Sequence, residues 1–454
     1  MVNAQLAVGD TPRRSLLAPG WWSLRWSERL VFLCLVFLPL QKALTIEAGF
    51  PLKISEILLF FALISLWSGH SKSGWQSSPR LKTMTLVLGL LVSVVCASVM
   101  WNLLVPLPND DFPGFDRSLT LDILLYGFYS VMVAIFWLVV SRQSSRVVGV
   151  GVSWATRLAA LFCAVQIILY NFSDFDTMRL LNMELVVGGA YGEPFPRNGS
   201  FHEGNYLGAF AAAVLLILLR RRDWWGALLG LGMLIYSQST GAIVAVMVGI
   251  LIAFMMRPRA LWQLVATGIT LIGLALAYVV DPVREYLAFQ VSKLTTLGED
   301  SVAVGEAGRS IVIREGKWET ALKIASDSPV LGVGPGRYGV WFHEKYDASL
   351  FPSDYQFSNG RAIAENAYGQ VVAELGFIGL LIFLAFLILH LLAGSRLGFW
   401  EVAVAGTTIV TLWTAPSWTT LTYWMALGVL AAYYGAAKRR AAPLRDPSSV
   451  AVTS

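Results

Sequence analysis

Twelve long apolar runs constrain the fold of this chain more than any other feature of its sequence. Inside a membrane no water reaches the backbone, so such runs satisfy their own hydrogen bonds as helices. Of all residues 56% are hydrophobic and 14% are charged, whereas soluble domains are about half apolar and a quarter charged. The expected helices cover residues 30–45, 54–69, 83–104, 120–141, 147–170, 204–219, 224–238, 240–256, 260–280, 366–393, 398–415 and 419–437. The sequence therefore predicts an all-α polytopic membrane protein with about 12 transmembrane helices.

Basic residues gather in the N-terminal tail, in every second loop after it and in the C-terminal tail. Arg220, Arg221 and Arg222 form one such loop, whereas Asp110 and Asp111 lie in an alternate, acidic loop. The positive-inside rule then places both termini in the cytoplasm, which requires an even number of helices. The net charge of +5 is thus a topology signal, and no nucleic-acid partner is expected.

Two external segments are longer than a connection requires. One covers residues 171–203, and the larger covers residues 281–365, between the ninth and tenth expected helices, with a helix expected at 310–326. Loops of this length inside a compact protein are usually functional. No repeat and no soluble domain is evident, so residues 1–454 are expected to form a single membrane domain.

The cysteines and histidines show no ligand pattern. Cys34, Cys96 and Cys163 lie inside apolar runs, and the four histidines are scattered without an HExxH or CxxC spacing. We therefore expect neither a metal nor a cofactor nor a disulfide framework. The first apolar run, 31–44, is interpreted as a retained helix and not as a cleaved signal peptide.

The first external loop ends in the segment 197–205, RNGSFHEGN, which opens the sixth expected helix. Arg197 beside the free backbone amides of a helix N-terminus makes a natural anion site. The alternative is a surface arginine in a turn with a polar cap.

The helix expected at 310–326 carries a second basic group. Arg314 and Trp318 are spaced i, i+4 and share a face with the neighbouring Lys317. This face is suited to docking a phosphate, and the alternative is an amphipathic helix with solvated charges. The glycine-rich segment 328–338 that follows has no preceding strand, so we interpret it as a tight turn and not as a nucleotide-binding loop.

The large loop closes at Glu365, where the tenth expected helix begins. Asn366, Gln370 and Glu374 form a polar stripe that should face protein or a watery cavity; interhelical hydrogen bonding is the alternative for Gln370 and Glu374. Glu365 lies at the outer boundary, where a carboxylate can act as a general base on a substrate hydroxyl. Arg157, midway along the fifth helix, is a further intramembrane charge whose partner the sequence does not identify.

Taken in order, these elements resemble the O-antigen ligase and polymerase superfamily, the membrane glycosyltransferases of the WaaL and Wzy type. The resemblance spans about residues 30–437 and lies in 197–205, the 237–239 turn, 314–334 and 365–376. It implies a GT-C-like fold in the bacterial inner membrane, with a periplasmic active site. It also implies metal-independent, inverting transfer of a glycan from undecaprenyl pyrophosphate to an acceptor saccharide, such as lipid A-core. Arg197 and Arg314 match the family's phosphate-binding arginines.

Two positions depart from the family pattern. Glu365 stands where the ligases have a histidine, and it is the candidate base, with His202 as the fallback. Thr240 stands where relatives carry an arginine, whose contribution Arg337 or Arg361 would have to supply. With Glu365, Arg197 and Arg314 as catalytic candidates, the expected substrate-binding residues are Asn205, His202, Lys317, Trp318, Arg337, Arg361, Asn366 and Tyr368.

The resemblance leaves the acceptor open. A ligase and a Wzy-type polymerase, which joins lipid-linked repeat units, share the fold and the donor and differ in the acceptor. A secondary transporter is the alternative from another class, but transporters tend to place ionisable groups near mid-membrane in two related halves. Here the candidate charges gather at one external face, which favours the transferase.

Overall fold

The computed structural model describes residues 23–47, 51–68, 79–104, 119–183, 196–257, 306–351 and 362–441. Apart from one pair of antiparallel two-residue strands, β1 (Ile46–Glu47) and β2 (Pro51–Leu52), the regular elements of these residues are helices. They are α1 (Trp26–Phe37), α2 (Ile54–Ser68), α3 (Pro79–Leu104), α4 (Leu119–Ser141), α5 (Ser145–Asn171), α6 (Phe175–Leu180), α7 (Gly204–Arg221), α8 (Trp224–Tyr236), α9 (Thr240–Met256), α12 (Glu306–Asp327), α13 (Tyr338–Lys345), the 3-10 turn η2 (Ala348–Leu350), α14 (Ala367–Leu397), α15 (Phe399–Leu412) and α16 (Leu421–Ala441).

The apolar runs form helices as expected. Within the described ranges, eleven of the twelve expected helices have a counterpart, and the expected helix at 260–280 lies outside them. Five of the described helices are long and apolar enough to cross a membrane: α3, α4, α5, α7 and α14. The described part of the chain is thus predominantly helical, and these helices indicate a multi-pass membrane protein. The full count of twelve crossings and the side of each terminus stay predictions. The helix expected at 310–326 is present as α12.

The first helix differs from its expected bounds of 30–45, because α1 ends at Phe37. Pro39 lacks an amide for the helical ladder, so the helix does not continue through it. The chain then turns, and the Gln41 side chain donates a hydrogen bond to the Leu38 carbonyl (2.5 Å). Hydrophobicity alone did not reveal this break.

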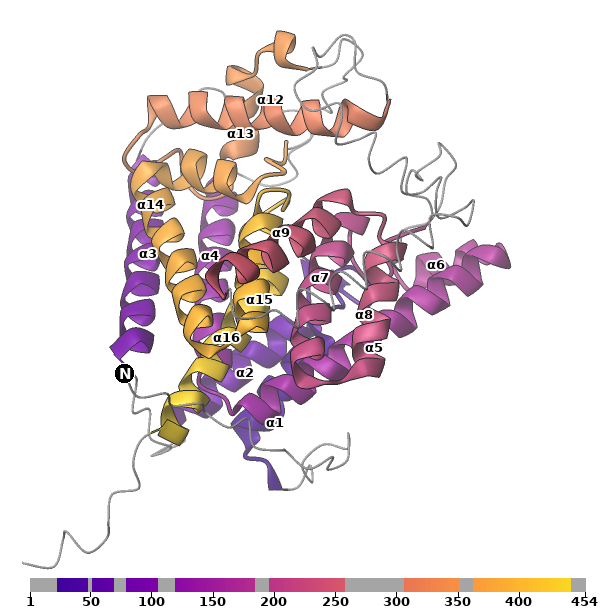
Figure 1. The fold of residues 1–454 in the computed structure, drawn as a ribbon. Helices are drawn as coiled ribbons and strands as arrows, with labels where there is room; N and C mark the ends of the chain where they lie inside the picture. Colours follow the sequence, from indigo (N-terminus) through magenta and orange to yellow (C-terminus); the bar gives the residue numbers. More distant parts are fainter. Residues whose placement is uncertain are drawn as a thin grey trace, which may run out of the picture.

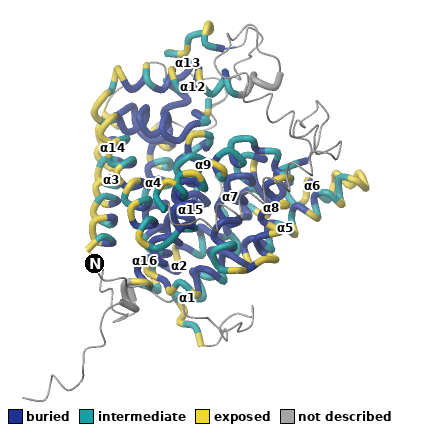
Figure 2. Tube along the Cα trace, viewed as in Figure 1, coloured by how far each residue is buried: buried dark blue, intermediate teal, exposed yellow. Residues whose placement is uncertain are grey.

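The helices form a bundle with a buried centre, and a further layer of helix covers one end of the bundle (Figure 1). Helix α7 packs against α8, α9 and α15. Of its most apolar 18-residue stretch 72% is buried, whereas the corresponding share in α3 is 28%. Exposed apolar side chains lie on the outward helices, as on α3 with Leu86, Met100 and Trp101 (Figure 2). Helix α12 lies across one end of the bundle and packs on the first part of α14. That end carries the candidate site.

Helix α14 is two helices joined at a break. Gly376 has φ 69° and ψ −175°, a backbone conformation that is essentially restricted to glycine. Its first segment, 367–375, is buried under α12, and the second segment turns away into the bundle (Figure 1). The break lets one helix both underlie α12 at the end that carries the candidate site and enter the apolar bundle.

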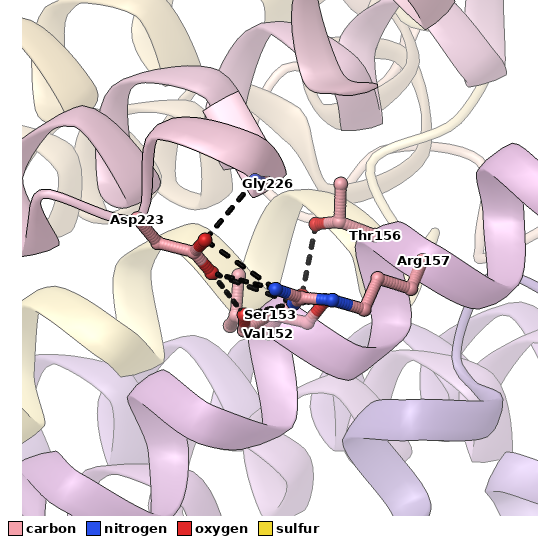
Figure 3. Close-up of polar contacts among 6 residues, drawn as sticks. All are labelled: Val152, Ser153, Thr156, Arg157, Asp223 and Gly226. Carbon is pink, nitrogen blue, oxygen red and sulfur yellow. Dashed lines mark hydrogen bonds and ion pairs between the residues drawn. The ribbon is translucent and has the colours of Figure 1, made fainter. Parts of the chain in front are cut away.

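The partner of Arg157 is Asp223, the N-cap residue of α8. Figure 3 shows the pair, with the guanidinium of Arg157 3.4 Å from the Asp223 carboxylate and the Ser153 hydroxyl donating to the same carboxylate. Asp223 Oδ1 also accepts a hydrogen bond from the amide of Gly226 (3.1 Å). The pair therefore satisfies a charge that would be costly alone in a membrane, and it ties α5 to the turn between α7 and α8.

Candidate functional site

The loop that carries Arg197 is held by a buried amide of α5. Gln166 Nε2 donates to Asn198 Oδ1 (2.8 Å), and the Gly199 amide donates to Gln166 Oε1 (2.7 Å). Gly199 has φ 56°, and a Cβ there would lie 2.7 Å from the sulfur of Cys163, so the tight approach to α5 requires glycine. The loop is thus fixed at both its side chains and its backbone.

The same loop is tied to the chain that follows α1. The Ser200 hydroxyl donates to the Pro39 carbonyl (2.8 Å), and the Ser200 carbonyl accepts from the amides of Gln41 (3.2 Å) and Lys42 (3.0 Å). The early end of α1 therefore has a role: the turn after it braces the loop that positions Arg197.

Arg197 lies across the start of α7. A Cβ built on Gly204 would lie 3.1 Å from Arg197 Cγ and 2.6 Å from the Ser237 carbonyl oxygen, so a side chain there would displace the arginine or the turn. One residue on, the Ser239 hydroxyl donates to Asn205 Oδ1 (3.2 Å). The sequence elements 197–205 and 237–239 thus meet at the N-terminus of α7.

The second basic group meets Glu365. Glu365 Oε1 lies 2.5 Å from Lys317 Nζ, and Glu365 Oε2 lies 3.4 Å from Arg314 Nε. Lys317 is only 5% exposed, and the Tyr338 hydroxyl donates to its carbonyl (3.1 Å). The alternative of solvated charges is therefore wrong for Lys317. Glu365 has φ 51°, a left-handed conformation that is uncommon for a residue other than glycine.

The two basic groups form one site with a carboxylate that the sequence analysis did not select, Glu203. The charges of Arg197, Arg314, Lys317 and Glu365 all act on the Glu203 carboxyl. Desolvation and the Glu365 charge raise the pKa of Glu203, and the three cations act in the opposite direction. We call these five side chains the charged cluster. It joins the loop before α7, helix α12 and the start of α14.

The remaining candidates on α14 have structural contacts. Asn366 Oδ1 caps the helix by accepting from the amides of Tyr368 (3.0 Å) and Gly369 (3.1 Å). The Tyr368 hydroxyl donates to the Ile409 carbonyl (2.6 Å). Gln370 donates to Glu374 (3.2 Å), and its Oε1 accepts from the Trp418 amide (3.2 Å). The polar stripe thus caps the helix and ties it to the turn before α16.

Aromatic rings border the charged cluster. Trp318, next to Lys317 on α12, lies with its ring centroid 5.1 Å from that of Trp413, which is 50% exposed. Trp413 in turn lies 6.2 Å from the Tyr368 ring. His202 is exposed, and its ring lies 6.1 Å from that of Tyr206.

The glycine-rich segment 328–338 closes the break in α14. The amides of Val333 and Gly334 donate to the carbonyls of Ala373 (2.9 Å) and Glu374 (3.0 Å). The interpretation as a turn is consistent with this arrangement, and the segment also satisfies carbonyls left free where the first half of α14 ends.

Arg337 and Arg361 are the candidates to supply the missing family arginine, and the structure describes only Arg337. Arg337 is 5% exposed, and its Nη1 donates to the Asn102 carbonyl (2.7 Å) at the end of α3. The structure therefore does not bring Arg337 into the charged cluster. Arg361 lies outside the described residues. Thr240 is the first residue of α9, behind the N-cap Ser239.

No group of three or more His, Cys, Asp or Glu side chains within the described ranges is arranged to hold a metal ion.

Residues 225–384 match the family model of the O-antigen ligases. This region is similar to the O-antigen ligase and polymerase superfamily. The match contains Arg314, Lys317 and Glu365, whereas Arg197 and Glu203 precede it. It supports an O-antigen ligase- or polymerase-type function and, with the apolar helices, a membrane location. No curated protein matches the chain.

Proposed function

We propose that this protein transfers a glycan from undecaprenyl pyrophosphate to an acceptor saccharide at the periplasmic face of the inner membrane. The observation that carries the proposal is the charged cluster: cations from two separated segments converge at one end of the bundle, within and next to the family match. We favour a ligase that uses lipid A-core or another glycan as acceptor, over a polymerase of lipid-linked repeat units.

The chemistry of the donor explains why cations are needed. Breaking the bond between sugar and pyrophosphate leaves negative charge on the departing phosphate, and positioned cations stabilise that charge. Arginine binds phosphate oxygens through two parallel hydrogen bonds, so Arg197 and Arg314 suit this task. Glu365 holds Arg314 and Lys317 on one side of the site. This transfer requires no metal.

The position of the cluster agrees with a periplasmic site. The Arg197 side chain packs beside Gly204, the first residue of α7. Arg220 and Arg221 lie in the last turn of the same helix. An α-helix of this length spans about 27 Å, close to the thickness of a membrane's hydrocarbon core. With the basic end in the cytoplasm, as the positive-inside rule requires, the charged cluster faces the periplasm.

Reconstitution of the purified protein with undecaprenyl-pyrophosphate glycan tests the proposal. Transfer of label to lipid A-core indicates the ligase, and lengthening of the lipid-linked glycan indicates the polymerase. Arg314→Ala should lower transfer at least about 100-fold, the effect expected for removing a donor that stabilises developing charge. Arg396→Ala, at the opposite end of α14 and exposed, is the matched control and should keep wild-type transfer.

Absence of transfer to every saccharide acceptor by the folded wild-type protein would refute the proposed function. Equal losses in Arg314→Ala and Arg396→Ala would refute the role of the charged cluster while leaving the activity in place.

A further inference from the structure

The two carboxylates of the charged cluster differ in what they contact. Both oxygens of Glu365 are engaged, Oε1 by Lys317 and Oε2 by Arg314. A carboxylate that is already paired on both oxygens is suited to holding cations in place.

Glu203 is placed differently. It is the N-cap residue of α7, with an extended backbone (φ −146°, ψ 161°), but its side chain does not cap the helix. Within the described ranges no ion pair of 4 Å or less engages its carboxylate, and the side chain is exposed. It nevertheless lies within electrostatic reach of the three cations and of Glu365. The residue is therefore open to an incoming hydroxyl at the edge of the cluster, while its surroundings partly desolvate the carboxyl.

We propose that Glu203 is the general base of the transfer and that Glu365 is a positioning residue that holds Arg314 and Lys317 toward the donor. This inference rests on the proposed function, and it assigns to Glu203 the role for which the sequence had selected Glu365.

In the proposed step, the acceptor hydroxyl gives its proton to a carboxylate oxygen of Glu203. The electron pair of the hydroxyl oxygen forms the new bond to the anomeric carbon. The bond from that carbon to the pyrophosphate oxygen breaks, and its electron pair leaves on the lipid pyrophosphate beside Arg197 and Arg314. Glu203 later returns its proton to water. The single displacement inverts the anomeric configuration, and no other reactant is needed.

The charge environment supports this division of roles. A general base works best when its pKa approaches the working pH, and desolvation and the Glu365 charge raise the pKa of Glu203 above its ordinary value of 4.5. A base acts when deprotonated, so activity should fall as the pH drops through this raised pKa. The charged and titratable groups that interact with Glu203 are Arg197 on its own loop, Tyr206 on α7, Arg314 and Lys317 on α12, Glu365 before α14 and Tyr423 on α16. His202 precedes Glu203 in the sequence.

Steady-state kinetics of the full-length, reconstituted variants test the inference. Glu203→Gln should lower kcat by about 100-fold or more, the usual contribution of a general base, while donor binding is unchanged. Glu203→Asp should restore part of the rate. Glu365→Gln should keep kcat within about tenfold and raise the donor KM, because the effect runs through the cations. Glu319→Gln, an exposed glutamate on α12 that does not act on Glu203, is the matched control.

The pH profile separates the two carboxylates further. The Glu365 charge raises the pKa of Glu203, so Glu365→Gln should shift the acidic limb of kcat/KM to lower pH. A Glu203→Gln protein that folds, binds donor and keeps wild-type kcat would overturn the inference and leave the proposed function intact. Loss of turnover confined to Glu365→Gln would also overturn it, by returning the base to Glu365. Absence of wild-type transfer would overturn the proposed function and this inference with it.

Discussion

Substituting Gly376 by alanine tests the break in α14 directly. The residue has φ 69° and ψ −175°, and a Cβ there would lie 2.5 Å from both the carbonyl carbon and the oxygen of Val330. These are backbone atoms, so no side-chain rotation relieves the contact. The glycine-rich segment must move away, or the break must rearrange.

The cost follows from two contributions. Holding alanine in this glycine-only region costs about 1–3 kcal/mol. Displacing the segment removes three backbone hydrogen bonds, from Phe377 to Pro329 (2.8 Å), Val333 to Ala373 (2.9 Å) and Gly334 to Glu374 (3.0 Å). Each contributes about 0.5–1.5 kcal/mol. We therefore expect Gly376→Ala to lower the free energy of unfolding by about 3–7 kcal/mol.

Thermal unfolding of the purified protein in detergent, followed by tryptophan fluorescence, measures the effect. The matched control is Gly232→Ala in α8, where a Cβ meets nothing within 4 Å. There alanine should be neutral or stabilising by up to about 1 kcal/mol. Gly376→Ala should also lose transfer activity, because the first half of α14 places Glu365 and Asn366. Equal melting temperatures for the two variants and the wild type would refute this account of the break.

Two further substitutions test the supports of the site. Gln166→Leu removes the hydrogen-bond partner of the Gly199 amide and that of Asn198 Oδ1, at about 1–3 kcal/mol each. The donor KM should rise, and Gln166→Glu, which still accepts from Gly199, should retain more activity. A donor KM unchanged in Gln166→Leu would contradict this positioning role. Asp223→Ala leaves Arg157 without its carboxylate and should cost about 3–5 kcal/mol. The double variant with Arg157→Leu should recover part of that loss in thermal unfolding, and strictly additive losses would show that the pair is not coupled.

The helices were predictable from sequence because the membrane leaves the backbone few alternatives. An apolar run must form a helix there, so α3, α5 and α7 follow from hydrophobicity alone. The same signal does not show where a helix stops early. α1 ends before Pro39, and the break in α14 depends on a glycine conformation set by distant contacts with the 328–338 segment. Such ends are decided by tertiary structure.

The candidate site was predictable in its residue types and less so in its pairings. Arginines and a glutamate close to two helix starts indicated a site at the N-terminal ends of α7 and α14. Arg337 showed no local sign that its guanidinium reaches Asn102, which is 235 residues away in the chain. Glu203, the proposed base, shows no local sign of that role, because it lies between His202 and a helix start, a place typical of a cap. Only the structure shows that Glu203 departs from the role of a cap, because its side chain makes no capping hydrogen bond to α7.

The charge balance of the cluster links its parts during the proposed transfer. Three cations and two carboxylates leave one net positive charge before reaction. When Glu203 accepts the acceptor's proton, the cluster gains a further positive charge at the moment when the leaving pyrophosphate gains a negative one. The base and the cations therefore act on the same step, because proton acceptance removes a carboxylate charge that would repel the leaving group. If Glu365 took the proton, its carboxylate would lose its hold on Arg314 and Lys317. For this reason we assign the two proposed roles to different residues.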